Sequence, residues 1–166
     1  MAMRLGSVVP DFTADSTAGS MRWHEYIENT WAVLFSHPGD FTPVCTTELG
    51  SVAKLMAEFE RRGVKVAAIS CNDTDSHHAW IEDIEALDQY CGSSKVSYPI
   101  VSDPSRDIAE LYGMIDPEEK SAEGLPMTCR YEAPPPSPRT GGDPSPHLPT
   151  SPPLHARSES FDSVFR

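Results

Sequence analysis

The stretch WAVLFSHPGDFTPVC, residues Trp31–Cys45, decides the fold class of this chain. Its first six residues are almost continuously apolar and rich in strand-forming types, which is typical of a strand buried on both faces. From Thr46 onward the apolar residues recur at helical spacing to about Arg62, and Gly63 is expected to end the helix. The stretch therefore joins a buried strand to a helix, with Cys45 at the junction.

The start of that helix favours a reactive thiol. Thr42 is a suitable N-cap residue, and Pro43 suits the first helical position, where its missing N–H costs nothing. Cys45 then lies in the first turn, where unpaired backbone N–H groups and the helix dipole stabilise an anion. We expect Cys45 to be a nucleophile at physiological pH. The alternative is a small, buried, apolar cysteine that merely begins a helix.

The rest of the N-terminal part alternates between strand and helix patterns. It predicts a strand at Lys65–Ser70, a helix from Asp73 to about Tyr90, a strand at Tyr98–Val101, and a helix from Asp103 through Leu111 that ends near Gly113. In the last helix, Asp103 is the expected N-cap, with Pro104 at the first helical position. Strands alternating with helices imply an α/β fold with a mostly parallel sheet.

Composition excludes several classes of function. The chain has 166 residues, 39% of them hydrophobic, and a net charge of −12. One core can be buried, but an acidic chain is a poor match for nucleic acid or an anionic membrane surface. No signal peptide or membrane span is expected, so a cytoplasmic protein is the default.

No metal or cofactor site is expected. The four cysteines, Cys45, Cys71, Cys91 and Cys129, are widely spaced and contain no Cys-x-x-Cys pair. The pair His77-His78 has no metal-binding partner at a suitable spacing. We interpret both histidines as solvated side chains on a polar helix.

From Tyr131 the composition changes to proline, serine and glycine. Nine prolines fall between Pro134 and Pro153. Such a segment lacks the apolar residues that would offset its ordering entropy. We therefore predict a disordered tail with polyproline character over Tyr131–Arg166.

Residues His37–Leu49 closely resemble the active-site signature of the peroxiredoxins, whose core is Pro-x-x-x-Thr/Ser-x-x-Cys. The segments Pro10–Phe12, Pro99–Asp103 and Gly124–Arg130 resemble the same family. The His-Pro before the loop and the Thr-Thr-Glu-Leu after it are most similar to the one-cysteine, peroxiredoxin six subfamily. The likeness runs from about Leu5 to Arg130.

This resemblance implies a thioredoxin-like domain over Leu5–Arg130. In the family, a strand hairpin and a further C-terminal segment follow the position of Arg130, and we expect this chain to lack both. If the hairpin normally pairs with Trp31–Ser36, the edge of that strand is expected to lie open. Family membership also implies a homodimer, and we expect its C-terminal contacts to be missing.

The resemblance further implies a role for five residues. By this resemblance Cys45 would reduce hydrogen peroxide or organic hydroperoxides and become a sulfenic acid. Thr42 hydrogen-bonds the peroxide and the thiolate, Pro38 shields the pocket from water, and Arg130 stabilises the charge. His37 orients the thiolate or helps the reductant to enter; a purely structural histidine is the alternative.

The one-cysteine resemblance implies glutathione as reductant, delivered in some cases by a glutathione S-transferase. No resolving cysteine in a Val-Cys-Pro context occurs here. A different class of function also stays open, in which a catalytically impaired splice or frameshift isoform acts as an interaction or regulatory protein through its proline-rich tail.

Overall fold

The computed structural model describes residues 7–87, 92, 94–120, 124–129 and 131–133. Its strands are β1 (Thr13–Ser16), β2 (Gly19–Arg22), β3 (Trp31–Ser36), β4 (Val64–Ser70), β5 (Ile100–Ser102), β6 (Ile115–Lys120), β7 (Pro126–Thr128) and β8 (Tyr131–Ala133). Its helices are α1 (Trp23–Ile27), α2 (Pro43–Arg61), α3 (Thr74–Ala86) and α5 (Asp107–Tyr112).

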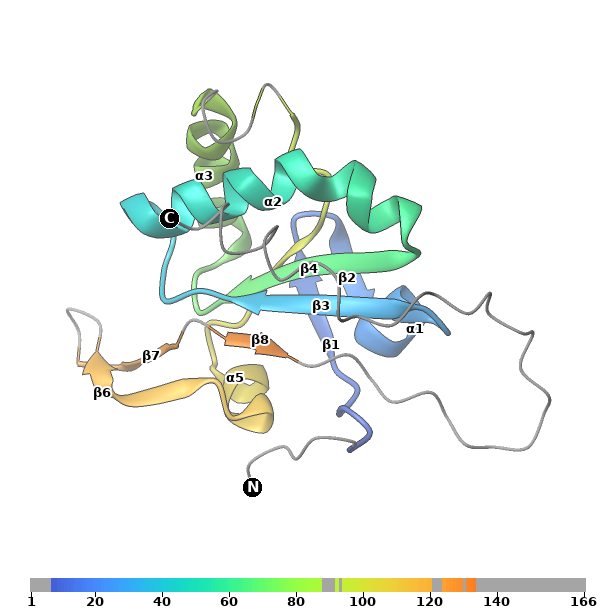
Figure 1. Ribbon diagram of the computed structural model, residues 1–166. Coiled ribbons are helices and arrows are strands. Elements are labelled where there is room, and N and C mark those ends of the chain that lie inside the picture. The colour runs from blue at the N-terminus through green and yellow to red at the C-terminus, as the bar shows by residue number, and fades with distance from the viewer. Residues whose placement is uncertain (1–6, 88–91, 93, 121–123, 130, 134–166) are drawn as a thin grey trace, which may run out of the picture.

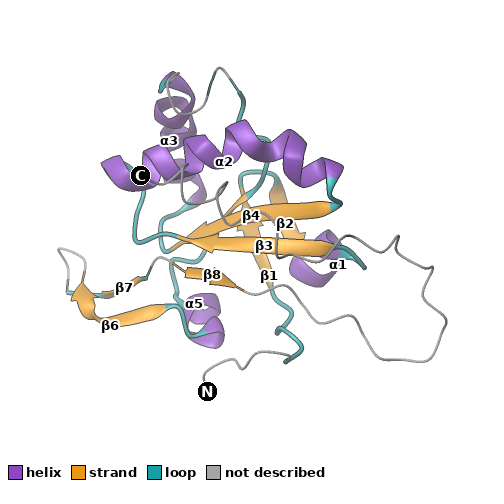
Figure 2. Ribbon diagram, viewed as in Figure 1, coloured by secondary structure: helices purple, strands orange, loops and turns teal. Residues whose placement is uncertain are grey.

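A six-stranded sheet in the order β2-β1-β5-β4-β3-β8 forms the middle layer (Figure 1). Its three central strands, β3, β4 and β5, are parallel, as the alternating pattern predicts. The outer strands β1, β2 and β8 pair antiparallel. The hairpin of β6 and β7 forms a second, two-stranded sheet beside the main one (Figure 2).

Helices cover both faces of the central sheet. On one face α2 and α3 pack over side chains such as Val66 and Ala68, and on the other α1 and α5 pack over Leu34 and Ile69 (Figure 1). Successive residues of a strand point to opposite faces, so one strand supplies both cores. The burial of both faces explains the continuous apolar run of β3.

Two predicted helix boundaries need correction. Helix α3 ends at Ala86, and the rest of the predicted helix to Tyr90 includes residues outside the described part of the chain. Helix α5 begins at Asp107, after Arg106 in the left-handed conformation (φ 69°), so Asp103 is not its N-cap residue. The Asp103 carboxylate nevertheless accepts hydrogen bonds from the backbone N–H groups of Ile108 and Ala109, at 3.3 and 2.8 Å. Asp103 thus satisfies free backbone N–H groups in the first turn of α5, although a turn separates Asp103 from the helix.

The predicted open edge of β3 is in fact covered over its last three residues. Strand β8 pairs antiparallel with β3, with Leu34 opposite Ala133 and Ser36 opposite Tyr131. The first three residues of the predicted disordered tail are thus part of the sheet, because proline interrupts the chain only from residue 134 onward. Residues 134–166, which carry the rest of that prediction, lie outside the described residues.

Candidate active site

Cys45 lies where the sequence predicts it, in the first turn of α2. Thr42 occupies the N-cap position with an extended backbone (φ −86°, ψ 135°), and Pro43 is the first helical residue. The preceding residue, Phe41, has a positive φ of 58°, a conformation that turns the chain from the loop into the helix. Cys45 is only 1% exposed and belongs to the core cluster between α2, α3 and the sheet. The position predicted for a nucleophile and the buried apolar environment therefore coincide at Cys45.

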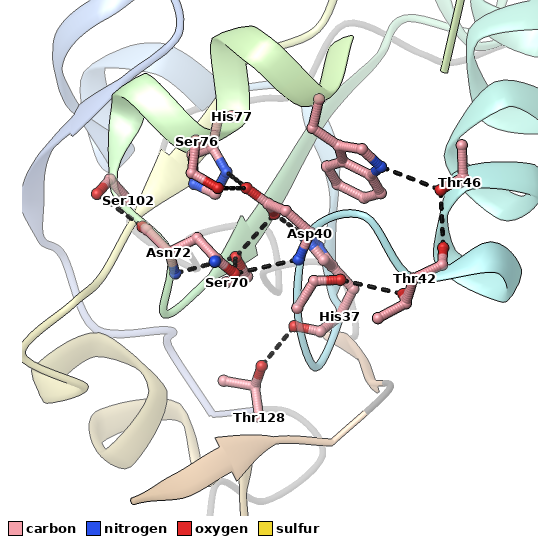
Figure 3. A network of polar contacts seen from close by, with 12 residues as sticks. His37, Asp40, Thr42, Thr46, Ser70, Asn72, Ser76, His77, Ser102 and Thr128 are labelled. Carbon is pink, nitrogen blue, oxygen red and sulfur yellow. Dashed lines mark hydrogen bonds and ion pairs between the residues drawn. The ribbon is translucent and has the colours of Figure 1, made fainter. Parts of the chain in front are cut away.

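The hydroxyl of Thr42 does not cap the helix. It donates to the backbone oxygen of Gly39 at 3.1 Å, within the loop that precedes α2. The backbone oxygen of Thr42 accepts from the Thr46 hydroxyl at 2.7 Å, and that hydroxyl accepts from the indole N–H of Trp80 at 3.0 Å. This chain of contacts ties the first turn of α2 to α3 (Figure 3).

Pro38 and Gly39 lie in the loop between β3 and α2. Pro38 is half-buried, and the adjacent His37 is 3% exposed. A Cβ atom on Gly39 would lie 3.7 Å from the methyl carbon of Met127 and 3.8 Å from the amide oxygen of Asn72. The loop therefore packs closely against the segments that follow β4 and form β7.

The ring of His37 shares a hydrogen bond with the carboxyl group of Asp40. The sequence did not identify Asp40 as a site residue. His37 Nε2 lies 3.0 Å from Asp40 Oδ1, and both side chains are buried. Burial lowers the pKa of His37 and outweighs the opposing hydrogen bond and charge of Asp40, so the ring is neutral at physiological pH. The other ring nitrogen, Nδ1, is buried without a hydrogen-bond partner among the described residues.

The interpretation of His77 as a solvated histidine is wrong. His78 is exposed as predicted, but His77 is fully buried and its Nδ1 lies 2.7 Å from Asp40 Oδ2. Ser76 also donates to Asp40 Oδ2 at 2.7 Å. A signal for this burial was available, because His77 precedes Trp80 by three residues and Ile84 by seven, which is the spacing of a buried helix face.

Asp40 is the centre of this network of polar contacts (Figure 3). Burial alone raises the pKa of a carboxyl, but hydrogen bonds from His37, His77 and Ser76, together with the charge of His77, hold the pKa of Asp40 well below its ordinary value. The backbone N–H of Asp40 donates to the amide oxygen of Asn72 at 3.1 Å. Asp40 is therefore a buried carboxylate with donors on both oxygens.

Arg130 is not among the described residues, so its predicted place in the site stays a prediction. The residues next to it contact the end of β3. The hydroxyl of Thr128 donates to the backbone oxygen of His37 at 2.5 Å, and the hydroxyl of Ser36 donates to the backbone oxygen of Cys129 at 2.8 Å. Within the described residues no group of three or more His, Cys, Asp or Glu side chains could hold a metal ion. No described helix is long and apolar enough to cross a membrane.

The chain belongs to the AhpC/TSA family, whose model matches residues 5–132. Within this family it is similar to one-cysteine peroxiredoxins. The 1-Cys peroxiredoxin PER1 of Triticum aestivum is 52% identical over 122 residues, and Peroxiredoxin-6 of Homo sapiens is 48% identical over 126 residues. These matches cover 74% and 76% of this chain but 55% and 56% of the relatives, so the chain spans about half the length of the curated relatives it matches.

Solved structures agree with this assignment. A cysteine-to-serine variant of the peroxiredoxin 6 of Arenicola marina is 46% identical and superposes with a TM-score of 0.73, over 78% of this chain and 58% of that one. A yeast mitochondrial 1-Cys peroxiredoxin, described with thiol resolution via glutathione and thioredoxin systems, is 36% identical with a TM-score of 0.67. That match covers 80% of this chain and 68% of the yeast chain. The fold is the thioredoxin-like fold of the peroxiredoxins, as the resemblance implies.

Proposed function

We propose that this chain is a thiol peroxidase that reduces hydrogen peroxide and organic hydroperoxides through Cys45. The sulfur of Cys45, as a thiolate, attacks the terminal oxygen of the hydroperoxide, and the S–O bond forms as the O–O bond breaks. The leaving hydroxide or alkoxide takes up a proton and departs as water or alcohol, and Cys45 becomes a sulfenic acid. The observation that carries this proposal is the position of Cys45 in the first turn of α2, directly after a central parallel strand.

Access to the thiol requires local opening. Cys45 is 1% exposed, whereas the neighbouring Phe41 and Val44 are 53% and 55% exposed. Exposed side chains have little buried surface to lose when a helix turn frays, so the start of α2 is suited to transient opening. A small hydroperoxide then reaches the sulfur past these residues.

The other predicted site residues support the reaction as follows. The hydroxyl of Thr42 donates to the backbone oxygen of Gly39, which leaves its oxygen lone pairs to accept a hydrogen bond from the peroxide. Pro38 limits the access of water, and Arg130 stabilises the charge that develops on the peroxide oxygens. The assignment of Arg130 is supported by its neighbours Thr128 and Cys129, which bond to His37 and Ser36 at the end of β3.

We propose a small thiol such as glutathione as the reductant, alone or with a glutathione S-transferase. The similar yeast mitochondrial enzyme is described with glutathione and thioredoxin systems, which supports a thiol reductant from outside the chain. Cys71 and Cys129 form no disulfide in the structure. A homodimer and a cytoplasmic location stay predictions from the sequence.

The direct test is the second-order rate of sulfenate formation at Cys45 with limiting hydrogen peroxide. Cys45→Ser provides the blank, and Cys71→Ser is the matched control because burial, its largest influence, raises the pKa of the Cys71 thiol. We expect a rate at least about 10³-fold above that of an ordinary thiol, since general electrostatic stabilisation contributes factors of this order. A rate equal to that of an ordinary thiol would contradict the proposal.

A second candidate function is an interaction or regulatory role of a catalytically impaired chain. It is favoured by one observation: the family match ends at residue 132, and the remaining 34 residues are rich in proline and serine. The same kinetic experiment separates the two functions. A correctly folded protein whose Cys45 reacts no faster than an ordinary thiol would favour the interaction role.

A further inference from the structure

Both ring nitrogens of His77 face hydrogen-bond acceptors. Nδ1 lies 2.7 Å from Asp40 Oδ2, and Nε2 lies 3.2 Å from the backbone oxygen of Val101 in β5. A backbone carbonyl can only accept, and an ionised carboxylate can only accept. With Asp40 ionised, His77 must therefore carry a proton on each nitrogen, which makes it a buried imidazolium.

The surroundings of Asp40 agree with an ionised carboxylate. Oδ1 accepts from His37 Nε2 at 3.0 Å and faces the Ser70 hydroxyl at 3.4 Å, and Oδ2 accepts from the Ser76 hydroxyl in addition to His77. The side chains of Asp40 and His77 are both 0% exposed. A buried charge is tolerated only when it is paired and hydrogen-bonded, and this pair meets both conditions.

The state of Asp40 determines the tautomer of His37. A carboxylate at 3.0 Å from Nε2 requires the proton of the neutral ring to lie on Nε2, which leaves Nδ1 as a bare lone pair. The other titratable groups that act on His37 are His77, which opposes its protonation, and Glu48 of α2, which favours it. Nδ1 is also the buried nitrogen that has no partner among the described residues.

His37 and Cys45 border the same buried cluster. The ring of His37 lies 4.9 Å from that of Trp80, and Trp80 donates to Thr46, the residue next to Cys45. Trp80 and Cys45 are both members of the core cluster on this face of the sheet. A change of tautomer at His37 therefore alters a polar group in the immediate surroundings of the reactive segment.

We infer that His77 is a positioning residue of the Cys45 site: its imidazolium keeps Asp40 ionised, and Asp40 in turn keeps His37 in the tautomer with a bare Nδ1. The kinetic part of this inference rests on the proposed peroxidase function, but the ion pair and the tautomer do not. Without the positive charge of His77, the buried Asp40 lacks compensation and takes up a proton. A protonated Asp40 can donate to Nε2 of His37, and the proton of that ring then moves to Nδ1.

The first test is nitrogen NMR of histidine rings in the full chain, labelled with ¹⁵N and carrying Cys45→Ser to prevent oxidation. In this protein we expect His77 to show two protonated nitrogens at neutral pH and His37 to show protonated Nε2 with bare Nδ1. His77→Gln removes the charge, and His78→Gln is the matched control because His78 is exposed on the same helix. We expect His77→Gln to move the proton of His37 to Nδ1, and His78→Gln to leave His37 unchanged.

Two results would overturn the inference. One is a singly protonated His77 ring in the protein that retains His77, which needs no destabilising variant to detect. The other is an unchanged His37 tautomer in folded His77→Gln protein. Neither measurement depends on catalysis, so these results remain informative even where the peroxidase proposal fails.

The second test compares the pH profile of sulfenate formation at Cys45 in the unmodified chain, His77→Gln and His78→Gln. We expect His77→Gln to shift the midpoint of the profile and His78→Gln to superimpose on the unmodified chain. A uniform loss of rate at every pH, with an unmoved midpoint, would mean that His77 is only structural. A slow unmodified chain would count against the proposed function and leave the NMR result to decide the ion pair.

Discussion

The two faces of the central sheet bury similar apolar side chains but treat polar groups differently. Under α1 and α5 the core is aromatic and aliphatic, with Phe12 stacked on Trp23 at 5.6 Å and set edge-on to Tyr112 at 5.8 Å. Under α2 and α3 the apolar core borders a buried network of Asp40 and two histidines. Packing on the first face stabilises the fold. On the second face, buried ionisable groups near Cys45 and the end of β3 cost free energy of folding.

The largest expected effect on stability lies on the aromatic face. Trp23 is 3% exposed and packs between Phe12 and Tyr26. We expect Trp23→Ala to lower the free energy of unfolding by about 3 to 5 kcal/mol, because it removes a large buried side chain and leaves a cavity. Urea denaturation followed by circular dichroism measures this change.

The matched control for that variant is Trp31→Ala. Trp31 is 50% exposed at the start of β3, so its loss should cost much less than that of Trp23. Equal losses for the two tryptophans would show that the aromatic face is not the main source of stability.

On the polar face, a substitution that keeps the size and shape of the side chain should still lower stability. We expect Asp40→Asn to lower the free energy of unfolding by about 3 kcal/mol, since it leaves the buried His77 without its counter-charge. Asp73→Asn is the control: Asp73 caps α3 by accepting from Ser76 N–H, and asparagine caps a helix as well as aspartate does. The comparison of the two faces breaks down if Asp40→Asn is as mild as Asp73→Asn in the same urea experiment.

A smaller effect is expected where the polar network meets α2. Thr46→Val keeps the shape of the side chain but leaves the buried indole N–H of Trp80 without its acceptor. We expect a loss of about 1 to 2 kcal/mol, the usual cost of an unsatisfied buried donor. Thr47→Val, which removes only the bond from the Thr47 hydroxyl to the Val44 backbone oxygen, should cost less than half as much. Identical unfolding midpoints for the two variants would argue against a structural role for the Trp80 contact.

Local patterns predicted the backbone of the site but not its polar network. The junction of β3 and α2, the N-cap position of Thr42 and the helix ends at Gly63 and Gly113 all follow from signals within a few residues. The two glycines adopt positive φ angles of 67° and 68°, which glycine allows without strain.

The polar network depends on contacts between distant parts of the chain. Asp40 meets Ser76 and His77, which follow it by 36 and 37 residues, and no local pattern fixes such a pairing. His77 also follows a run of polar residues at the start of α3, so the local sequence did not suggest that its side chain is buried. Strand β8 was not predicted for a different reason. It has three residues before a proline-rich segment, too few to show the alternation of apolar and polar residues that marks a strand.

The smallest expected effect is the dependence of stability on pH through the buried groups of the polar face. Burial lowers the pKa of His37 in the folded chain, so between about pH 7 and pH 5 the unfolded chain binds a proton that the folded chain does not. The contribution of His37 to stability should therefore fall on acidification through this range. Below about pH 4 the stability should fall further, because Asp40 stays a carboxylate in the folded chain but takes up a proton in the unfolded chain.

Thermal unfolding across the pH range measures both steps. His37→Gln should flatten the upper step, because it removes the side chain whose pKa burial lowers, and His78→Gln should leave it intact, because His78 is exposed. An upper step that persists in His37→Gln would assign it to another group and remove the difference in acid sensitivity between the two faces.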